Sequence, residues 1–171
     1  MSLIHPTRSF RIFLIVCMLY LANSIALGQD SLRTHFTWFH VGLGAGFLQQ
    51  KRPPHYEDRQ AISFGLILAH QRDTHVFSLR FVHNEIPWFI GSATTVSDIG
   101  FLYGRGTKPS TWSASAGGGL ALVAEKTNTL GVPLNAQIVW APGSRFGLGL
   151  YAFANLNRLR SFGGFLLCVR F

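Results

Sequence analysis

The C-terminal stretch Ser161-Phe-Gly-Gly-Phe-Leu-Leu-Cys-Val-Arg-Phe171 alternates between two kinds of residue. One face of an extended chain would carry the apolar residues Phe165, Leu167, Val169 and Phe171. The other face would carry Gly164, Cys168 and Arg170. Successive side chains of a β-strand point to opposite faces, so a period of two predicts a strand with one apolar face. This strand would end on an aromatic residue.

The same period recurs in seven further segments upstream. Together with the last segment they cover about residues 38–48, 62–69, 77–81, 98–104, 112–125, 132–140, 146–155 and 164–171. The chain is 48% hydrophobic, yet after residue 28 it has no run of the roughly 18 apolar residues that a spanning helix needs. Bacterial single-chain barrels have an even number of strands. We therefore predict an all-β fold, an eight-stranded antiparallel up-and-down transmembrane β-barrel.

The N-terminus has the layout of a cleaved secretory signal peptide. Arg8 and Arg11 precede an apolar run over residues 12–21, and Ala26 and Gly28 supply the small residues that a signal peptidase requires. We predict a signal peptide over residues 1–28 and a barrel domain over residues 29–171. The two arginines take the formal charge from +8 to +6 when they leave.

The connections alternate in length. Those at residues 71–74, 105–110 and 141–144 are short and rich in turn-forming residues, as expected of periplasmic turns. Those at 49–59 and 84–94 are longer and are predicted to be outward-facing loops, whereas 126–129 and 157–160 are short. This order predicts that both termini are periplasmic. The role of the apolar stretch 86–90 (Ile-Pro-Trp-Phe-Ile) stays open between a leaflet or partner contact and a cap on the barrel mouth.

Aromatic residues gather at one rim of the predicted barrel. If the N-terminus is periplasmic, the periplasmic ends of the apolar faces hold Phe39, Phe77, Tyr103, Trp112, Trp140, Phe146 and Phe171. Aromatic rings are favoured at the membrane–water interface. We expect these seven residues to form a periplasmic aromatic girdle.

The inward faces are rich in glycine and serine and include Arg80, Asp98, Glu125 and Arg170. A barrel of eight strands is just wide enough to be filled by its own side chains. We therefore expect a plugged, polar interior to which Tyr151 and Phe153 add volume, with a narrow porin-like channel as the alternative. A charge inside the barrel needs a partner, so Arg80 and Asp98, on neighbouring strands at similar heights, are predicted to pair.

Sites for chemistry are sparse. Cys168 is the single cysteine after the predicted signal peptide, so no intramolecular disulfide can form there. The six remaining histidines lack metal-site spacing, and we assign no catalytic, cofactor-binding or metal-ligating residue. Scattered rather than clustered basic residues argue against a nucleic-acid partner. His83 is the best candidate for acid–base chemistry, although no serine lies two residues from it.

The strand pattern, the aromatic rim and the terminal Phe171 resemble those of OmpA-like and related small outer-membrane β-barrel domain proteins. Residues 131–140 and 147–157 are also similar to uncharacterised barrels of Bacteroidota. The resemblance implies residence in the Gram-negative outer membrane, contact with its lipid and lipopolysaccharide, and a structural or interaction role. It also implies that the barrel-assembly machinery recognises Phe165, Leu167, Val169 and Phe171.

Two other classes of protein remain as alternatives to this interpretation. One is a lipid-modifying barrel enzyme similar to the lipid A deacylases, some of which use a His–Ser–Glu site. The other is a soluble lipocalin-like barrel, in which the apolar face would point inward.

Overall fold

The computed structural model of the chain describes residues 35–52, 55–86, 94–125, 128–142 and 146–171. Eight strands account for most of these residues. They are β1 (His35–Arg52), β2 (His55–Arg72), β3 (His75–Ile86), β4 (Thr94–Gly106), β5 (Trp112–Ala124), β6 (Thr129–Trp140), β7 (Gly147–Asn157) and β8 (Arg160–Arg170). The predicted signal peptide over residues 1–28 lies outside the described residues.

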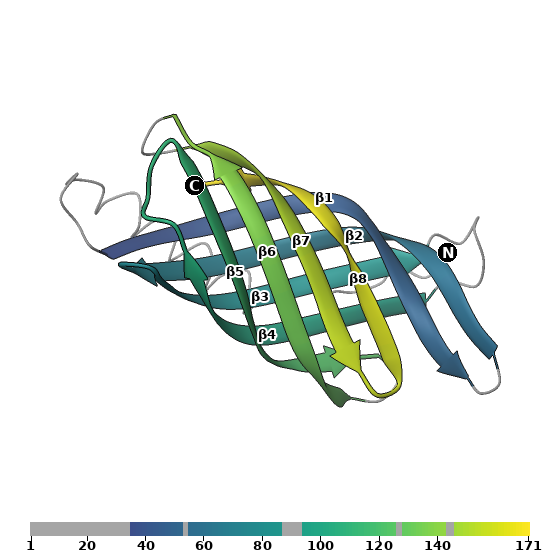
Figure 1. Cartoon of the computed structure of the whole chain (residues 1–171). Coiled ribbons are helices and arrows are strands. Elements are labelled where there is room, and N and C mark those ends of the chain that lie inside the picture. Colours follow the sequence, from purple (N-terminus) through teal and green to yellow (C-terminus); the bar gives the residue numbers. More distant parts are fainter. Residues whose placement is uncertain (1–34, 53–54, 87–93, 126–127, 143–145) are drawn as a thin grey trace, which may run out of the picture. The chain divides into compact units, whose positions relative to one another are not determined.

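The strands form one closed sheet in which each strand pairs with its sequence neighbours (Figure 1). All pairings are antiparallel, and the pairing of β1 with β8 closes the barrel. Closure leaves no open sheet edge along the barrel wall. The predicted eight-stranded antiparallel up-and-down barrel is confirmed. The described residues contain no helix that is long and apolar enough to cross a membrane.

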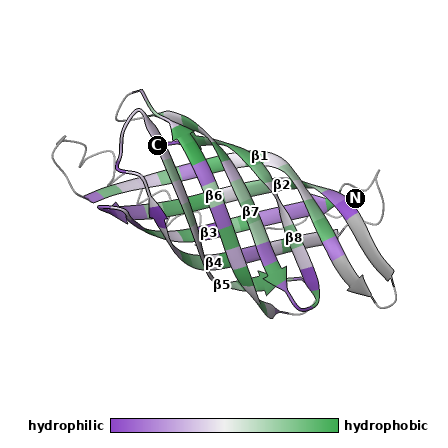
Figure 2. Cartoon of the chain, in the orientation of Figure 1, coloured by the Kyte–Doolittle hydropathy of each residue, from purple (hydrophilic) through white to green (hydrophobic). Residues whose placement is uncertain are grey.

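Side chains alternate between the interior and the outer surface along each strand. On β3, Ser78 and Arg80 are buried while Phe77 and Leu79 are each 40% exposed. On β8, Leu166 and Cys168 are buried while Phe165 and Leu167 point outward. Apolar and polar stretches accordingly alternate along the ribbons in Figure 2. The apolar faces of the predicted strands are the outer faces of the barrel.

The β1–β2 hairpin is longer than the sequence pattern predicts. Residues 49–59 were expected to form an outward-facing loop, but β1 continues to Arg52 and β2 begins at His55. Only residues 53–54 of that segment lie outside the described residues. The prediction was wrong because a ladder of backbone hydrogen bonds needs no apolar alternation. Loss of alternation therefore marks the end of the apolar belt and not the end of the strand.

The other connections agree better with expectation. The turn between β2 and β3 consists of two residues, Asp73 and Thr74, and Asp73 adopts a φ of 55°. β7 and β8 are also joined by two residues. In the predicted loop 84–94, β3 continues through Ile86 and β4 begins at Thr94, while residues 87–93 lie outside the described residues. The apolar stretch 86–90 is thus described at its first residue alone, the buried Ile86.

The interior is more apolar than the sequence pattern predicts. A single cluster of buried hydrophobic residues includes Trp38, Ile67, Val82, Tyr151, Phe153, Phe162 and Leu166. Most of these residues occupy inward positions that alternate with the apolar outward ones. The expectation of a mainly polar interior was therefore wrong. Where both faces of a strand carry apolar residues, the alternation in the sequence does not reveal the apolar side chains that point inward.

Glycines allow β1 and β8 to approach closely at the seam that closes the barrel. A Cβ atom on Gly44 would overlap the carbonyl oxygen of Phe165, and one on Gly164 would overlap that of Ala45. Backbone atoms of a hydrogen-bonded strand cannot move aside without breaking the ladder. Glycine is therefore required at these two positions, as it is where one strand bends closely against another.

Candidate functional site

A fully buried polar network lies inside the barrel and joins β3, β4 and β7. Arg80 donates from Nη2 to the carboxylate of Asp98, and neither side chain has any exposed surface. Asn155 donates from Nδ2 to the same carboxylate oxygen at 2.7 Å. Arg80 also donates from Nη1 to the carbonyl of Leu134 on β6 at 3.1 Å, and its guanidinium lies 6.0 Å from the ring centre of Phe153. The structure thus brings together the two residues that the sequence singled out, and it adds Asn155.

A second buried hydrogen bond lies nearby. Ser63 on β2 donates to Asn84 on β3 at 2.7 Å, and both side chains are fully buried.

Glu125 and Arg160 form a second ion pair, which differs from that of Arg80 and Asp98 in its exposure. Glu125, just beyond the end of β5, forms a 2.6 Å ion pair with Arg160, and both side chains are partly exposed. Glu125 is therefore paired at the rim rather than in the core.

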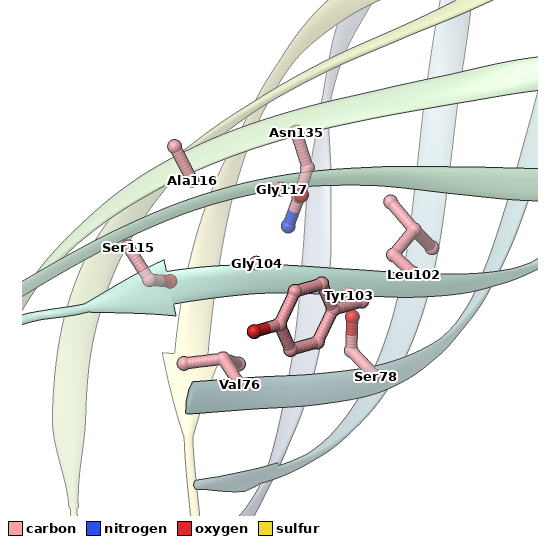
Figure 3. A pocket seen from close by; sticks show the side chains of 9 residues that line it. All are labelled: Val76, Ser78, Leu102, Tyr103, Gly104, Ser115, Ala116, Gly117 and Asn135. Carbon is pink, nitrogen blue, oxygen red and sulfur yellow. The ribbon is translucent and has the colours of Figure 1, made fainter. Parts of the chain in front are cut away.

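One small pocket of about 10 Å³ lies between β3, β4, β5 and β6 (Figure 3). Its lining includes Ser78, Ser115 and Asn135, and Gly104 and Gly117 contribute only backbone. A cavity of this size accommodates about one water molecule. It cannot accept an organic ligand, so the pocket is not a binding site for a substrate or cofactor.

An arginine and two aromatic rings occupy the end of the barrel where the chain terminates, which we call the C-terminal rim. The guanidinium of Arg170 lies 4.6 Å from the ring centre of Phe36 and 5.4 Å from that of Trp38. Arg170 also donates from Nη1 to Ser113 at 3.2 Å. These contacts connect β8 with β1 and with β5 across the barrel.

His40 lies directly beside this group and is 1% exposed. Its ring centre is 6.2 Å from that of Trp38. Neither ring nitrogen of His40 has a hydrogen-bond partner among the described residues. The burial excludes a surface role for this histidine.

The outer face carries a histidine–serine pair near the opposite rim. His83 on β3 and Ser97 on β4 are direct partners in the register, and Ser97 Oγ lies 2.7 Å from His83 Nδ1. Glu85 follows two residues along the same outward face of β3. Ser97 was not predicted as a partner of His83, because the two residues lie on different strands and are 14 positions apart in the sequence. The register of the β3–β4 ladder was the information that was needed.

The seven residues of the predicted girdle all lie on the outer surface and fall into three groups. Phe77 and Tyr103 are register partners with ring centres 5.2 Å apart. Trp112 and Trp140 are also register partners, with ring centres 6.4 Å apart. The backbones of Phe39 and Phe171 exchange two hydrogen bonds, and the ring of Phe146 packs edge-on against Phe171 at 5.5 Å.

The four residues of the predicted assembly signal share the outer face of β8 and its end. Phe165, Leu167, Val169 and Phe171 are between 38% and 74% exposed. The described residues include no group of three or more histidine, cysteine or acidic side chains that could hold a metal ion.

No protein-family model matches the chain, and no curated protein matches its sequence. Solved structures do match in fold. The chain is similar to Neisserial surface protein A (NspA), with a TM-score of 0.60 and 12% identity over 77% of this chain and 95% of that one. It is also similar to Ail, the attachment invasion locus protein of Yersinia pestis, with a TM-score of 0.52 and 13% identity over 78% and 98% of the two chains. At this identity the likeness establishes the fold, a small closed eight-stranded β-barrel.

Proposed function

We propose that the protein is an integral β-barrel of the Gram-negative outer membrane with a structural or interaction role and no enzymatic activity. One observation carries this proposal. Every strand exposes large apolar side chains on the outer surface of the barrel, for example Leu43, Ile62, Leu79, Phe101, Leu120, Leu134, Leu150 and Leu167. Soluble monomeric proteins rarely expose contiguous apolar patches larger than a few hundred Å². A belt around all eight strands is the surface that a lipid bilayer covers.

The same belt argues against the soluble alternative. A lipocalin-like barrel would place its most apolar face inside, around a ligand cavity. Here the interior holds a buried ion pair, and the small pocket found in it has a volume of about 10 Å³. The outer surface is the more continuous apolar face, so it fits a bilayer better than it fits water.

Cell fractionation and heat-modifiable gel migration test this proposal. A closed barrel that resists detergent unfolding migrates differently before and after boiling. We expect the protein in the outer-membrane fraction, with a mobility that changes on heating. Recovery in the soluble periplasm would overturn the proposal.

We propose further that both termini are periplasmic and that the barrel-assembly machinery recognises the outward residues of β8. What supports this is that the longest connection, between Ile86 and Thr94, and the projecting end of the β1–β2 hairpin lie at the opposite rim, since the outward loops of such barrels are longer than their periplasmic turns. Phe171→Ser is expected to lower the folded protein in the outer membrane several-fold. Phe162→Tyr, in the buried core of the same strand, is the control for general damage to β8, and it should leave the level closer to wild type.

The interior is proposed to be closed to solutes. Tyr151, Phe153 and Phe162 are each at most 4% exposed, and Arg80 spans the space between β3 and β6. In planar bilayers the purified protein should show no ion conductance above background. Stable single-channel steps would favour the porin-like alternative instead.

The pair His83–Ser97 favours a second candidate function, a lipid hydrolase. A serine hydroxyl within hydrogen-bond reach of an imidazole can be deprotonated by it and attack an ester. The pair faces outward, where acyl chains would lie, and Glu85 occupies the same face. In this candidate function Ser97 attacks the ester carbonyl, His83 takes its proton, and the alcohol leaves with that proton. Water then attacks the acyl-serine with His83 as the base, and the fatty acid leaves as Ser97 regains its proton.

A fluorophosphonate probe and an assay of acyl release from lipid A and phospholipid test this second candidate. Activity that is lost in both Ser97→Ala and His83→Ala would establish it. Thr95→Ala is the matched control, because Thr95 is a hydroxyl residue on the same outward face of β4. Absence of release and of labelling in the wild-type protein would remove the candidate.

A further inference from the structure

We propose that the C-terminal rim holds the phosphate group of an anionic phospholipid on a row of four basic or imidazole side chains from β1 to β4. The row consists of His35, Arg72, His75 and Arg105. This inference rests on the proposed membrane location, because it places a lipid headgroup beside the barrel.

The row follows directly from the register of three strand pairs. His35 lies opposite Arg72, Arg72 lies opposite His75, and His75 lies opposite Arg105. Directly opposed residues of an antiparallel pair point to the same face, with Cβ atoms about 5 Å apart. All four side chains therefore point outward and follow one another around the rim.

The row borders the apolar belt. The next outward-facing row, two residues farther from the rim, consists of Thr37, His70, Phe77 and Tyr103. The basic row therefore meets exposed aromatic rings along β3 and β4. The ring of His75 stacks against Tyr103 at 5.9 Å, and its Nδ1 lies 2.7 Å from the tyrosine hydroxyl. Because that hydroxyl occupies Nδ1, Nε2 is the nitrogen of His75 that remains for a ligand. Toward the rim, the aromatic ring of Tyr103 is followed by its hydroxyl and then by the imidazole of His75. Polarity increases in the same direction from the acyl chains of a bilayer to its headgroups.

Within the described part of the chain, the two arginines of the row, Arg72 and Arg105, form no ion pair. Asp73 lies in the adjacent turn, whereas Glu85 and Glu125 lie toward the other end of the barrel. Arginine presents a planar fork of donors that matches phosphate, and it keeps its charge at all physiological pH values. Two arginines that alternate with two imidazoles thus form a surface complementary to a phosphodiester.

A phospholipid is the occupant that this position favours over a soluble anion. The side chains project sideways from the barrel wall at the edge of the apolar belt and do not line a pocket. A free phosphate there would have water on its outer side and little to hold it. A lipid phosphate is held at this height by its own acyl chains, which lie against the belt, so little additional ordering is required.

Reconstituted full-length protein purified from membranes provides the test. Phosphatidylcholine bilayers receive trace spin-labelled phosphatidylglycerol or phosphatidylcholine, and electron paramagnetic resonance measures the share of each lipid immobilised on the barrel. One cation near a bilayer surface contributes roughly a factor of five in affinity for an anionic lipid. We expect the wild-type protein to prefer phosphatidylglycerol at least several-fold, and Arg72→Gln/Arg105→Gln to reduce the preference to near one.

Arg158→Gln is the matched control, since Arg158 is an exposed arginine in the turn at the opposite end of the barrel. It should retain the preference. Equal loss in this variant and in the double variant, or no loss in either, would overturn the proposal. Backbone amide shifts of residues 72, 75 and 105 should respond to phosphatidylglycerol. An identical response to inorganic phosphate in phosphatidylcholine discs would reassign the row to a free anion and also overturn it.

The experiment separates this inference from the proposed membrane location. Insertion into phosphatidylcholine discs, read from a heat-modifiable gel shift, tests the location alone. A protein that inserts but shows no lipid preference contradicts the headgroup site and leaves the membrane barrel standing.

Discussion

Arg80 and Asp98 form an ion pair across β3 and β4 without being register partners. Arg80 lies opposite Gly100, and Asp98 lies opposite Val82, so the guanidinium reaches diagonally across the ladder. A fully buried pair of this kind is strongly destabilised when one partner is removed.

Arg80→Met should therefore lower the free energy of unfolding by about 3–5 kcal/mol, because the buried Asp98 loses its ionic partner. Arg80→Met/Asp98→Leu should recover most of that loss. Urea unfolding in lipid vesicles, followed by tryptophan fluorescence, measures both variants. Arg160→Gln is the control, since the partly exposed pair with Glu125 contributes about 1 kcal/mol or less. A single Arg80 variant as stable as the double one would contradict the pairing.

The closing seam depends on Gly44. Gly44→Ala places a methyl group against the backbone oxygen of Phe165, and relieving the overlap requires β1 and β8 to separate. Overpacking of this kind costs roughly 1–3 kcal/mol, and the rigid ladder favours the upper end. Gly118→Ala is the control, because its nearest neighbour would be the flexible end of Leu134 at 3.0 Å. Equal folded fractions of the two variants in a refolding titration would show that the seam tolerates the methyl group.

Charge on the outer face distinguishes a bilayer from water. Leu134 lies at mid-height on β6, opposite Gly118, and is 43% exposed, whereas Leu130 near the start of β6 is 76% exposed. In a membrane Leu134→Arg should cost about 2–4 kcal/mol and Leu130→Arg about 0–1 kcal/mol, since the penalty falls toward the interface. Unfolding titrations in vesicles compare the two. A soluble barrel would tolerate both substitutions equally.

Arg170 connects β8 to β1 and β5 at the C-terminal rim. Arg170→Gln removes its contacts with the rings of Phe36 and Trp38, and we expect a loss of about 2 kcal/mol for such a desolvated cation–π group. Urea titration measures the change in stability. The emission spectrum of Trp38, recorded in a variant without the other tryptophans, should shift as the ring loses its cation. Arg158→Gln should change neither quantity.

The outer part of the β1–β2 hairpin is expected to be dispensable for folding. The pairing of β1 with β8 reaches Gln50, and that of β2 with β3 begins at Ile62. Replacing residues 51–56 with Asn-Gly joins the register partners Gln50 and Glu57, so it keeps the pairings that close the barrel and supplies a favoured two-residue hairpin turn. The shortened protein should retain its heat-modifiable migration, with stability within about 1 kcal/mol of wild type. Failure to fold would show that the hairpin contributes to barrel formation.

Much of this protein could be predicted from its sequence because a two-residue period is a local property. Alternation fixes the face on which each side chain lies, so the outward direction of Phe165 and Leu167 and the inward direction of Arg80 and Asp98 could be derived residue by residue. The number of alternating segments predicted the eight strands. Because an apolar outer face is stable in a lipid bilayer, the same pattern predicted a membrane protein.

Only the tertiary structure decided which residues meet across strands, because register depends on backbone pairing over the whole sheet. It placed Ser97 against His83, added Asn155 to the Arg80–Asp98 pair and aligned His35, Arg72, His75 and Arg105 in one row. It also extended β1 and β2 beyond the point where alternation stops, since backbone hydrogen bonds continue where hydropathy gives no signal. Local periodicity determines the direction of a side chain, whereas its neighbours depend on a closed sheet in which shifting one strand shifts all the others.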